Sequence, residues 1–406
     1  MEKKRILVSA YGCEPGRGSE AGVGWNWVLQ LAREYDVHVI ARANDAEKIE
    51  ANIPEDLRDS LHFTYYDTKK WLMKIKKKSK RLYIYYTFWQ IGIIKVIKRL
   101  KKEYDFDYSM HLTFGSLWMP TFLPFFKIPF IWGPVGGADC VPKKLIKRLP
   151  FKDRVVQRFR YFLIKTSPIN LFVAYPSRKA VGILCRTKNN IAAIPKKHRH
   201  KAKVIIETGM SEEVFKNEKD YSVGNETVEI AVVGRLIPIK NVEAAIESLR
   251  IVKEEFSNVH MTIMGDGKLR DKLSDMCKGY GLTDDVTFSG EIAREQVLEN
   301  LRKSDIYFLT SLHEGGSWSL MEAMATGLPT VCLDWTGMGV IVDDQSGMKV
   351  KPTTYEQICK DYADNLKKLI SDKTLRKQMG LNARNRIKEE YNWENKVDFV
   401  KGVIDR

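Results

Sequence analysis

Two glutamates, Glu314 and Glu322, stand eight positions apart around a pair of glycines. Gly315 and Gly316 let the backbone approach a ligand closely, and Ser317 is a candidate N-cap for a following helix. The free amides in the first turn of such a helix point at an anion such as a diphosphate. A helical carboxylate can then accept hydrogen bonds from sugar hydroxyls. The segment suits a nucleotide sugar, although an ordinary capped surface helix would show the same spacing.

A second group of residues follows an apolar run at 230–233. Gly234 ends this predicted strand, and Arg235 and Lys240 come next. Ligands gather at the carboxyl ends of strands in open α/β sheets. Arginine offers a bidentate fork and lysine a point charge, so the two cations suit a diphosphate. A further strand end of this kind is predicted at Gly265, in a Gly-Asp-Gly turn.

These motifs occur in a fixed order: Gly-Arg-Leu at 234–236, the lysine five residues after Arg235, Gly-Asp-Gly at 265–267, and Glu-x7-Glu before Ala-Met-Ala-x-Gly-x-Pro. In these motifs the sequence resembles the retaining glycosyltransferases of family 4. The resemblance implies the GT-B fold, an α/β architecture with two Rossmann-like doubly wound domains that face each other across a cleft. The donor sugar would be transferred with retention of its anomeric configuration.

The resemblance also implies roles for single residues. Arg235 and Lys240 would stabilise the leaving diphosphate. Glu314 would orient the donor sugar, and Glu322 would hold the ribose hydroxyls. The predicted catalytic residues are His111, Arg235, Lys240 and Glu314. The predicted donor-binding residues are Gly18, Ser19, Gly234, Arg235, Lys240, Gly265, Glu314, Gly315, Gly316, Ser317, Trp318 and Glu322.

The N-terminal half supplies the remaining candidates. Gly18 and Ser19 lie in a glycine-rich loop at 12–24 that lacks a clean Gly-x-Gly-x-x-Gly dinucleotide pattern. His111 follows a predicted strand at 106–110, and the resemblance places such a histidine beside the transferred sugar. A neutral imidazole could bind a sugar hydroxyl there, although a lone histidine at a strand end is often structural.

An acceptor side is predicted at Gly136, Gly137 and Asp139, which follow another apolar run. A solvated loop aspartate is at least as plausible for the last of these. Asp105 and Asp107 imitate a metal-binding Asp-x-Asp motif, but their position favours the start of a strand. We therefore expect no metal and no cofactor, with the nucleoside diphosphate sugar acting as co-substrate.

The charge is distributed unevenly along the chain. Of a formal +16, residues 1–210 carry +22, from 40 Lys and Arg against 18 Asp and Glu, and the remainder carries −6. Such asymmetry indicates that the first half meets an anionic partner, unless it is merely a soluble basic surface. The six cysteines are scattered without a close pair, so we expect reduced, packed thiols.

The segment 69–102 holds 13 Lys or Arg and no acid, with aromatic and aliphatic residues interleaved. That composition favours contact with an anionic membrane surface, because the apolar stretch is too short to span a bilayer of about 30 Å. Alternatively, the aromatics pack inside the N-terminal domain. Nucleic acid is not expected as a partner, since no recognisable binding module is present. The short apolar run at the start predicts a first strand, not a signal peptide, and hence a cytoplasmic protein, peripheral on the inner face of the membrane.

The pattern of strands and helices predicts two doubly wound domains, at 1–210 and 211–385. The resemblance implies that the first binds the acceptor, that the second binds the donor, and that a helix at 386–406 crosses back to the first domain. The predicted function is transfer of a sugar to an acceptor hydroxyl, on a lipid-linked saccharide in bacterial envelope or exopolysaccharide synthesis. Two alternatives stay open. One is a GT-B enzyme acting on a soluble acceptor or as a nucleotide-sugar epimerase, and the other is a donor-binding pseudoenzyme subunit.

Overall fold

The structure is a computed structural model that describes residues 3–68, 82–216, 219–221 and 226–405. The chain divides into two compact units. Unit 1 comprises Met1–Ala138, Phe162–Glu207 and Trp393–Arg406, and unit 2 comprises Asp139–Tyr161 and Thr208–Asn392. Each unit therefore combines distant parts of the chain. The functional domain bounds expected at 1–210, 211–385 and 386–406 stay a prediction.

Unit 1 is built on a parallel sheet with the order β3-β2-β1-β4-β5-β6-β7. Its strands are β1 (Arg5–Ser9), β2 (Asp36–Ala41), β3 (Leu61–Tyr65), β4 (Tyr108–His111), β5 (Phe130–Val135), β6 (Ala180–Cys185) and β7 (Ala202–Val204). The interior strand β1 has Ile6, Leu7 and Val8 fully buried. This continuous apolar run is what a parallel strand covered on both faces requires.

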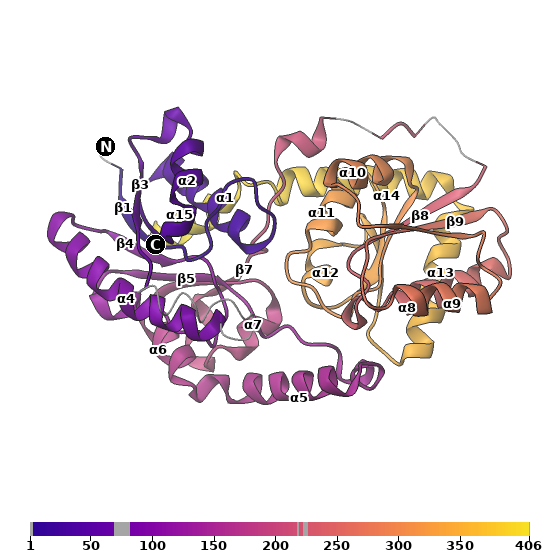
Figure 1. Ribbon diagram of the computed structural model, residues 1–406, viewed down its shortest axis with the longest axis horizontal. Coiled ribbons are helices and arrows are strands. Elements are labelled where there is room, and N and C mark those ends of the chain that lie inside the picture. Colours follow the sequence, from indigo (N-terminus) through magenta and orange to yellow (C-terminus); the bar gives the residue numbers. More distant parts are fainter. Residues whose placement is uncertain (1–2, 69–81, 217–218, 222–225, 406) are drawn as a thin grey trace. The chain divides into compact units, whose positions relative to one another are not determined.

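Helices cover both faces of this sheet (Figure 1). They are α1 (Ser19–Glu34), α2 (Ala46–Asn52), α4 (Leu82–Glu103), α6 (Leu171–Lys179), α7 (Lys188–Ala193) and α15 (Lys396–Ile404). Helix α5 (Phe151–Thr166) begins in unit 2 and ends in unit 1. The last helix, α15, packs on the first, α1. It carries Lys396, which is 1% exposed, and burial lowers the pKa of this ammonium to about 7.

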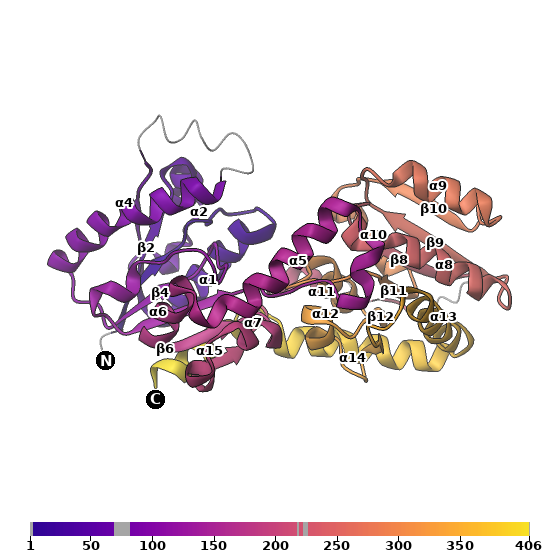
Figure 2. The same cartoon turned by 90° about the horizontal axis from the view of Figure 1, so that it is seen from below.

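Unit 2 contains a second parallel sheet with the order β10-β9-β8-β11-β12-β13. Its strands are β8 (Val228–Val233), β9 (Val259–Met264), β10 (Val286–Gly290), β11 (Ile306–Leu309), β12 (Thr330–Leu333) and β13 (Gly347–Val350). Its helices are α8 (Val242–Lys253), α9 (Arg270–Gly279), α10 (Arg294–Lys303), α11 (Trp318–Ala325), α12 (Thr336–Ile341), α13 (Tyr355–Ser371) and α14 (Lys373–Glu390). Figures 1 and 2 show α8, α9 and α13 on one face of this sheet and α10, α11 and α14 on the other.

Both sheets have the doubly wound pattern that the alternation of strands and helices predicted. In each, the strand order reverses beside the first strand, β1 or β8. Ligands bind at the carboxyl ends of strands near such a switch point. The fold class is therefore confirmed, and the loops after β1 and β4 in unit 1 and after β8 and β11 in unit 2 are the positions to examine for a site.

The predicted membrane-binding segment 69–102 divides into two parts. Residues 69–81 lie outside the described residues, and the rest falls in α4. In α4 one face enters the core of unit 1, where Tyr85, Tyr86 and Trp89 are fully buried. Tyr83 and Phe88 are exposed. Packing inside the unit, which was the alternative, thus accounts for a large share of these aromatics. No helix in the described ranges is long and apolar enough to cross a membrane.

Candidate functional site

The ends of β8 and β9 interlock through glycine backbones. The amide of Gly234 donates to the carbonyl of Met264 at 2.9 Å, and the amide of Gly265 donates to the carbonyl of Gly290 at 2.8 Å. A Cβ atom on Gly265 would lie 2.1 Å from the Gly234 oxygen, and the φ angle of Gly265 is +141°. Only glycine suits such a conformation and such a close approach. Backbone hydrogen bonds at glycine residues therefore connect the carboxyl ends of these neighbouring strands at this edge of the sheet.

A cavity of about 610 Å³ opens at this edge. Arg235 is exposed at the cavity and, among the described residues, forms no ion pair with a carboxylate. The cavity is lined by Val233, Gly234, Arg235, Met264, Gly265, Asp266, Gly267, Glu291, Ile292 and Val297. The predicted residues Gly234, Arg235 and Gly265 thus come together. The sequence analysis missed Glu291 and Ile292, which lie between β10 and α10, and Val297, which lies in α10.

Lys240 lies next to these glycines and forms an ion pair with Glu314. The ammonium is 2.5 Å from the Glu314 carboxylate, and the two side chains are 18% and 17% exposed. The backbone of Lys240 is held because its carbonyl accepts from the hydroxyl of Thr310 at 3.0 Å. A Cβ atom on Gly234 would be 3.6 Å from Cε of Lys240, so the lysine stem passes beside the strand end. The structure therefore joins two predicted catalytic residues.

The loop of Glu314 is fixed from the side of α12. The amide of Glu314 donates to the hydroxyl of Thr336 at 3.1 Å, and its carbonyl accepts from the amide of Gly337 at 2.9 Å. A Cβ atom on Gly337 would lie 1.8 Å from the carbonyl oxygen of Gly315. Gly337 was not predicted, because nothing in the motif indicates a partner about twenty positions later. The loop that precedes α11 is thus positioned by backbone contacts.

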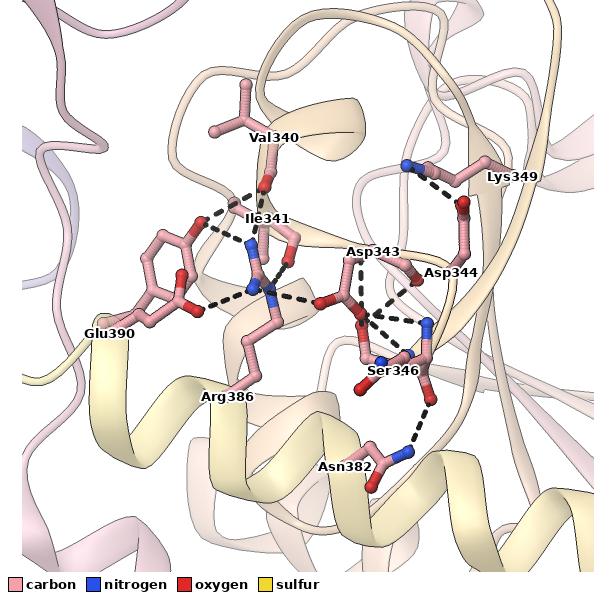
Figure 3. Close-up of polar contacts among 11 residues, drawn as sticks. Val340, Ile341, Asp343, Asp344, Ser346, Lys349, Asn382, Arg386 and Glu390 are labelled. Atoms are coloured by element: carbon pink, nitrogen blue, oxygen red, sulfur yellow. Dashed lines mark hydrogen bonds and ion pairs between the residues drawn. The ribbon is translucent and has the colours of Figure 1, made fainter.

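An arginine on α14 holds the far end of α12 (Figure 3). The Arg386 guanidinium lies 3.0 Å from the carboxylate of Asp343 and 2.7 Å from that of Glu390. It also donates to the carbonyl of Ile341 at 2.8 Å. These contacts tie the loop after α12 to α14. Through α12, they support the segment that contacts Glu314.

The helix that follows Glu314, Gly315 and Gly316 begins as predicted. Ser317 is the N-cap of α11, and its hydroxyl accepts a hydrogen bond from the amide of Leu320. Gly315, Gly316 and Trp318 precede or open this helix and are partly buried. The amides at such a terminus carry partial positive charge, so this end of α11 favours an anion.

Glu322 lies inside α11 and is 6% exposed. Its carboxylate is 2.6 Å from Nε of Arg294, the first residue of α10. Burial raises the pKa of Glu322, and the Arg294 cation acts in the opposite direction. Helix α10 also carries Val297, which lines the cavity. Sequence analysis missed Arg294, since a long-range ion pair leaves no local pattern.

A second unpredicted arginine approaches this region. Nη1 of Arg160, on α5, lies 3.5 Å from Nε2 of His313 and 3.3 Å from the carbonyl oxygen of Asp139. Burial lowers the pKa of His313 to about 4, and the Arg160 cation acts in the same direction. His313 is therefore a neutral ring at neutral pH, next to the ion pair formed by Glu314.

In unit 1, His111 ends the central strand β4, paired with Ser9 of β1 and Trp132 of β5. It is 2% exposed, and its Nδ1 atom has no hydrogen-bond partner among the described residues. Burial lowers the pKa of His111 to about 4, while a hydrogen bond with the Phe114 backbone acts against this shift. The ring is neutral at neutral pH, as the predicted role in binding a hydroxyl requires.

The glycine-rich loop of unit 1 docks on the segment after His111. The amide of Gly12 donates to the hydroxyl of Thr113 at 2.9 Å, and the Glu20 carboxylate accepts from the amide of Gly115 at 3.1 Å. Gly18 is exposed and is the N-cap of α1, which Ser19 begins. The loop is therefore next to the end of β4. A direct role for Gly18 and Ser19 in donor binding stays a prediction.

The predicted acceptor residues follow β5. The amide of Gly136 donates to the carbonyl of Gly115 at 2.6 Å, which brings this turn beside the segment after β4. Gly137 has a φ angle of +107°. Asp139 is 7% exposed, so it is a buried residue and not the solvated loop aspartate of the alternative. Gly136 and Gly137 group with unit 1 and Asp139 with unit 2.

Part of the chain is similar to known glycosyltransferases. Residues 213–386 match the family model described as glycosyl transferases group 1. The uncharacterized glycosyltransferase MJ1069 of Methanocaldococcus jannaschii is 30% identical over 204 residues, which is 50% of this chain and 51% of that protein. The chain thus spans about half the length of this curated relative.

Two solved structures align with nearly the whole chain. WaaG, a glycosyltransferase involved in lipopolysaccharide biosynthesis, aligns with a TM-score of 0.59 at 18% identity, over 98% of this chain and 100% of that chain. The fold is GT-B. Anabaena HepE in complex with UDP also aligns, with a TM-score of 0.61 at 14% identity over 98% of this chain and 99% of that chain. In this GT-B protein, the cavity beside Arg235 lies in the part that matches the group 1 glycosyltransferase family.

Proposed function

We propose that this protein is a glycosyltransferase that moves a sugar from a nucleoside diphosphate sugar to an acceptor hydroxyl. The observation that carries the proposal is the cavity at the ends of β8 and β9, where Arg235 is exposed without a carboxylate partner among the described residues. It lies inside the segment that matches the group 1 family. The HepE structure in complex with UDP supports a nucleotide donor for this fold.

The charges explain how the donor would be activated. Departure of the diphosphate requires cations at the oxygens where negative charge develops, because preorganised charge lowers the barrier most. Arg235 offers a free guanidinium fork for this purpose. Lys240 is already paired with Glu314, so a diphosphate would share its ammonium with that carboxylate. We propose that the same contact lets Glu314 orient the donor sugar.

Glu322 would hold the ribose hydroxyls, and the amides at the start of α11 would contact phosphate or sugar. Burial favours a hydrogen-bonded carboxylate, and Arg294 keeps that of Glu322 paired. The diphosphate charge is offset by Arg235, Lys240 and the helix amides, so the proposed reaction includes no metal and no cofactor. Retention of anomeric configuration is part of the proposal and rests on the motifs of family 4.

The proposed acceptor is a lipid-linked saccharide of the bacterial envelope or of an exopolysaccharide, and the protein would lie on the inner face of the membrane. The name of WaaG, which is involved in lipopolysaccharide biosynthesis, supports the envelope role. His111 would bind a sugar hydroxyl with its neutral ring. Gly136, Gly137 and Asp139 would line the acceptor side.

Helix α5 supports membrane contact. Its residues Phe151, Val155, Phe159 and Phe162 recur at helical spacing and are 71%, 49%, 56% and 60% exposed. Lys and Arg are interspersed along the same helix, with a single acidic residue. An exposed apolar face beside cations is suited to the interface of an anionic bilayer. We therefore add α5 to the segment 69–102 as a surface for anionic lipid.

The donor is tested first by thermal unfolding with UDP, GDP, ADP and their sugar conjugates. A nucleotide that binds the folded protein raises its melting temperature. We expect one nucleotide to stabilise the protein selectively, and Glu322→Ala to abolish that shift. The selected donor is then combined with saccharide and polyprenyl-linked acceptors, with and without a chelator, and the product is analysed for its anomeric configuration.

The variant Arg235→Ala tests the assigned chemistry. Loss of a preorganised charge contact in the transition state costs about 10²–10³ in kcat. The matched control is Arg250→Ala, which removes a guanidinium that pairs with Glu247 and Glu254 on α8. We expect transfer to fall with the first variant and to persist with the second. Near-native transfer by Arg235→Ala would refute its assigned role.

The alternatives give other results. An epimerase would convert the donor without an acceptor, and a pseudoenzyme would bind the donor without turnover. A transferase with a soluble acceptor would act equally well without lipid.

A further inference from the structure

A cluster of three ligand-type side chains lies in unit 1, away from the transfer residues. Asp36 and His38 belong to β2, and His62 belongs to the neighbouring strand β3. The register pairs His38 with His62. Since side chains alternate along a strand, Asp36 and His38 share one face. The cluster is at the amino ends of these parallel strands, whereas His111 lies at the carboxyl end of β4.

The distances suit a small cation. Oδ1 of Asp36 lies 3.5 Å from Nε2 of His38 and 3.1 Å from Nε2 of His62. One ligand atom from each of the three residues lies within 4.8 Å of the others. Tetrahedral zinc with bonds of about 2.0–2.1 Å separates its ligand atoms by about 3.3 Å. The distances from Oδ1 of Asp36 to the two imidazole nitrogens are therefore close to the distance between ligand atoms around zinc.

The carboxylate of Asp36 presents an unused oxygen to the histidines. Its Oδ2 atom accepts a hydrogen bond from Nε of Arg5 at 2.6 Å. Its Oδ1 atom is buried and has no hydrogen-bond partner among the described residues. The nearby imidazole nitrogens are thus close to Oδ1 but not aligned to donate to it. A buried acceptor without a donor costs free energy, and a bound cation would remove that cost.

The two histidines complement each other as ligands. His38 is 5% exposed, and its ring packs against Tyr104 and Phe106, with centroid distances of 4.4 and 5.3 Å. The side chain of His62 is 43% exposed. One ring is therefore held in place by packing, and the other gives access from solvent. A water molecule can complete the coordination sphere on that open side.

We propose that Asp36, His38 and His62 form a binding site for a divalent transition metal, with Zn²⁺ as the best match. Two imidazoles and a carboxylate are ligands that zinc accepts, and the fourth position would hold water. Because β3 is the edge strand of the sheet, the metal would fasten this edge to β2. The site has a structural role and does not depend on the proposed sugar transfer.

The experiment uses the full chain without a polyhistidine tag, freed of metal with a chelator and then titrated with Co²⁺. Four-coordinate Co²⁺ with nitrogen and oxygen ligands gives visible absorption bands, and Zn²⁺ displaces it. We expect one equivalent of Co²⁺ to bind and Zn²⁺ to raise the melting temperature. His62→Gln removes a half-exposed ligand, and Asp36→Asn removes the charged one.

The matched control is His260→Gln, because His260 is also a strand histidine near a carboxylate, with Nδ1 3.0 Å from Glu229. We expect His62→Gln and Asp36→Asn each to weaken Co²⁺ binding by more than the roughly 10–100-fold that follows when a metal ligand loses its hydrogen-bond partner. Binding by His260→Gln should equal that of the wild type. The proposal is overturned if the wild type shows no bands at millimolar Co²⁺, or if the bands survive both cluster variants. It is equally overturned if the control variant loses the bands.

Discussion

Each unit has an arginine directly after a strand, and the two arginines differ in their carboxylate partners. In unit 1, Arg186 follows β6 and lies 3.5 Å from the Glu20 carboxylate and 3.3 Å from that of Glu207. In unit 2, Arg235 follows β8, is exposed at a cavity, and has no carboxylate partner among the described residues. Residues 1–210, with a net charge of +22, pair Arg186 with carboxylates. The remainder, with a net charge of −6, leaves Arg235 without a carboxylate partner among the described residues. Net charge therefore does not locate an anion site.

The largest expected difference in stability concerns two glycines after strands, Gly265 in unit 2 and Gly136 in unit 1. A Cβ atom on Gly265 would meet the backbone oxygen of Gly234 at 2.1 Å and would require a φ angle of +141°. One on Gly136 would instead meet Cδ of the Arg186 side chain at 2.7 Å, which can move. We expect Gly265→Ala to lower the free energy of unfolding by about 4 kcal/mol, from backbone strain and overpacking. Urea titration should show a much smaller loss for Gly136→Ala, and equal losses would contradict the difference.

The arginines themselves give the next effect. Arg186→Met leaves Glu207, whose side chain is 9% exposed, without this cation. We expect a loss of about 2 kcal/mol in the free energy of unfolding, because this buried carboxylate loses a charged partner while the cation of Lys396 stays nearby. Arg235→Ala should change stability by less than about 0.5 kcal/mol, because the residue is exposed. Chemical denaturation of both variants measures the contrast. A stability loss with Arg235→Ala would make that residue structural.

The third effect is the pH dependence of stability that the buried, neutral His111 causes. The folded pKa of His111 is about 4, below the ordinary value of about 6.5, so between these values the unfolded chain binds more protons. Stability from this group is complete above pH 6.5 and falls as the pH drops towards 4. At pH 5 we expect the wild type to have lost about 2 kcal/mol relative to His111→Gln. Urea titrations from pH 7 to pH 4 test the difference.

The pKa of His313 in unit 2 can be compared with that of His111 in unit 1. The pKa of His313 is also about 4, because burial and the cations of Arg160 and Lys240 lower it, while the Glu314 carboxylate acts in the opposite direction. Salt screens charges more than it alters burial. We therefore expect added salt to raise the pKa of His313 and to leave that of His111 unchanged, as followed by NMR of the ring protons. An equal change in both pKa values would show that nearby charges do not contribute more to the pKa of His313 than to that of His111.

Local patterns predicted a large part of this molecule. Apolar runs such as 230–233 gave the strands, and the glycines at 234 and 265 marked strand ends that meet in space. Ser317 was identified as an N-cap, because its position before an apolar run is a local signal. Such features depend on neighbours in the sequence, and therefore a single chain is enough to recognise them.

Contacts between distant segments were not predictable in this way. Arg294 pairs with Glu322 from another helix, and Arg160 reaches His313 from a segment more than 150 positions earlier. The cluster of Asp36 and His62 depends on the register between β2 and β3, which the sequence does not display. In α4, aromatic residues on one face are buried and those on the other are exposed. Composition alone could not assign each of them to a face.

The division of unit 1 has a consequence for protein synthesis. Its sheet is made from the first half of the chain, but α15 packs on α1 and comes from the last 14 residues of unit 1, Trp393–Arg406. During translation, the ribosome must produce all of unit 2 before that helix exists. Until then, α1 of the nascent first unit lacks the packing partner that α15 provides.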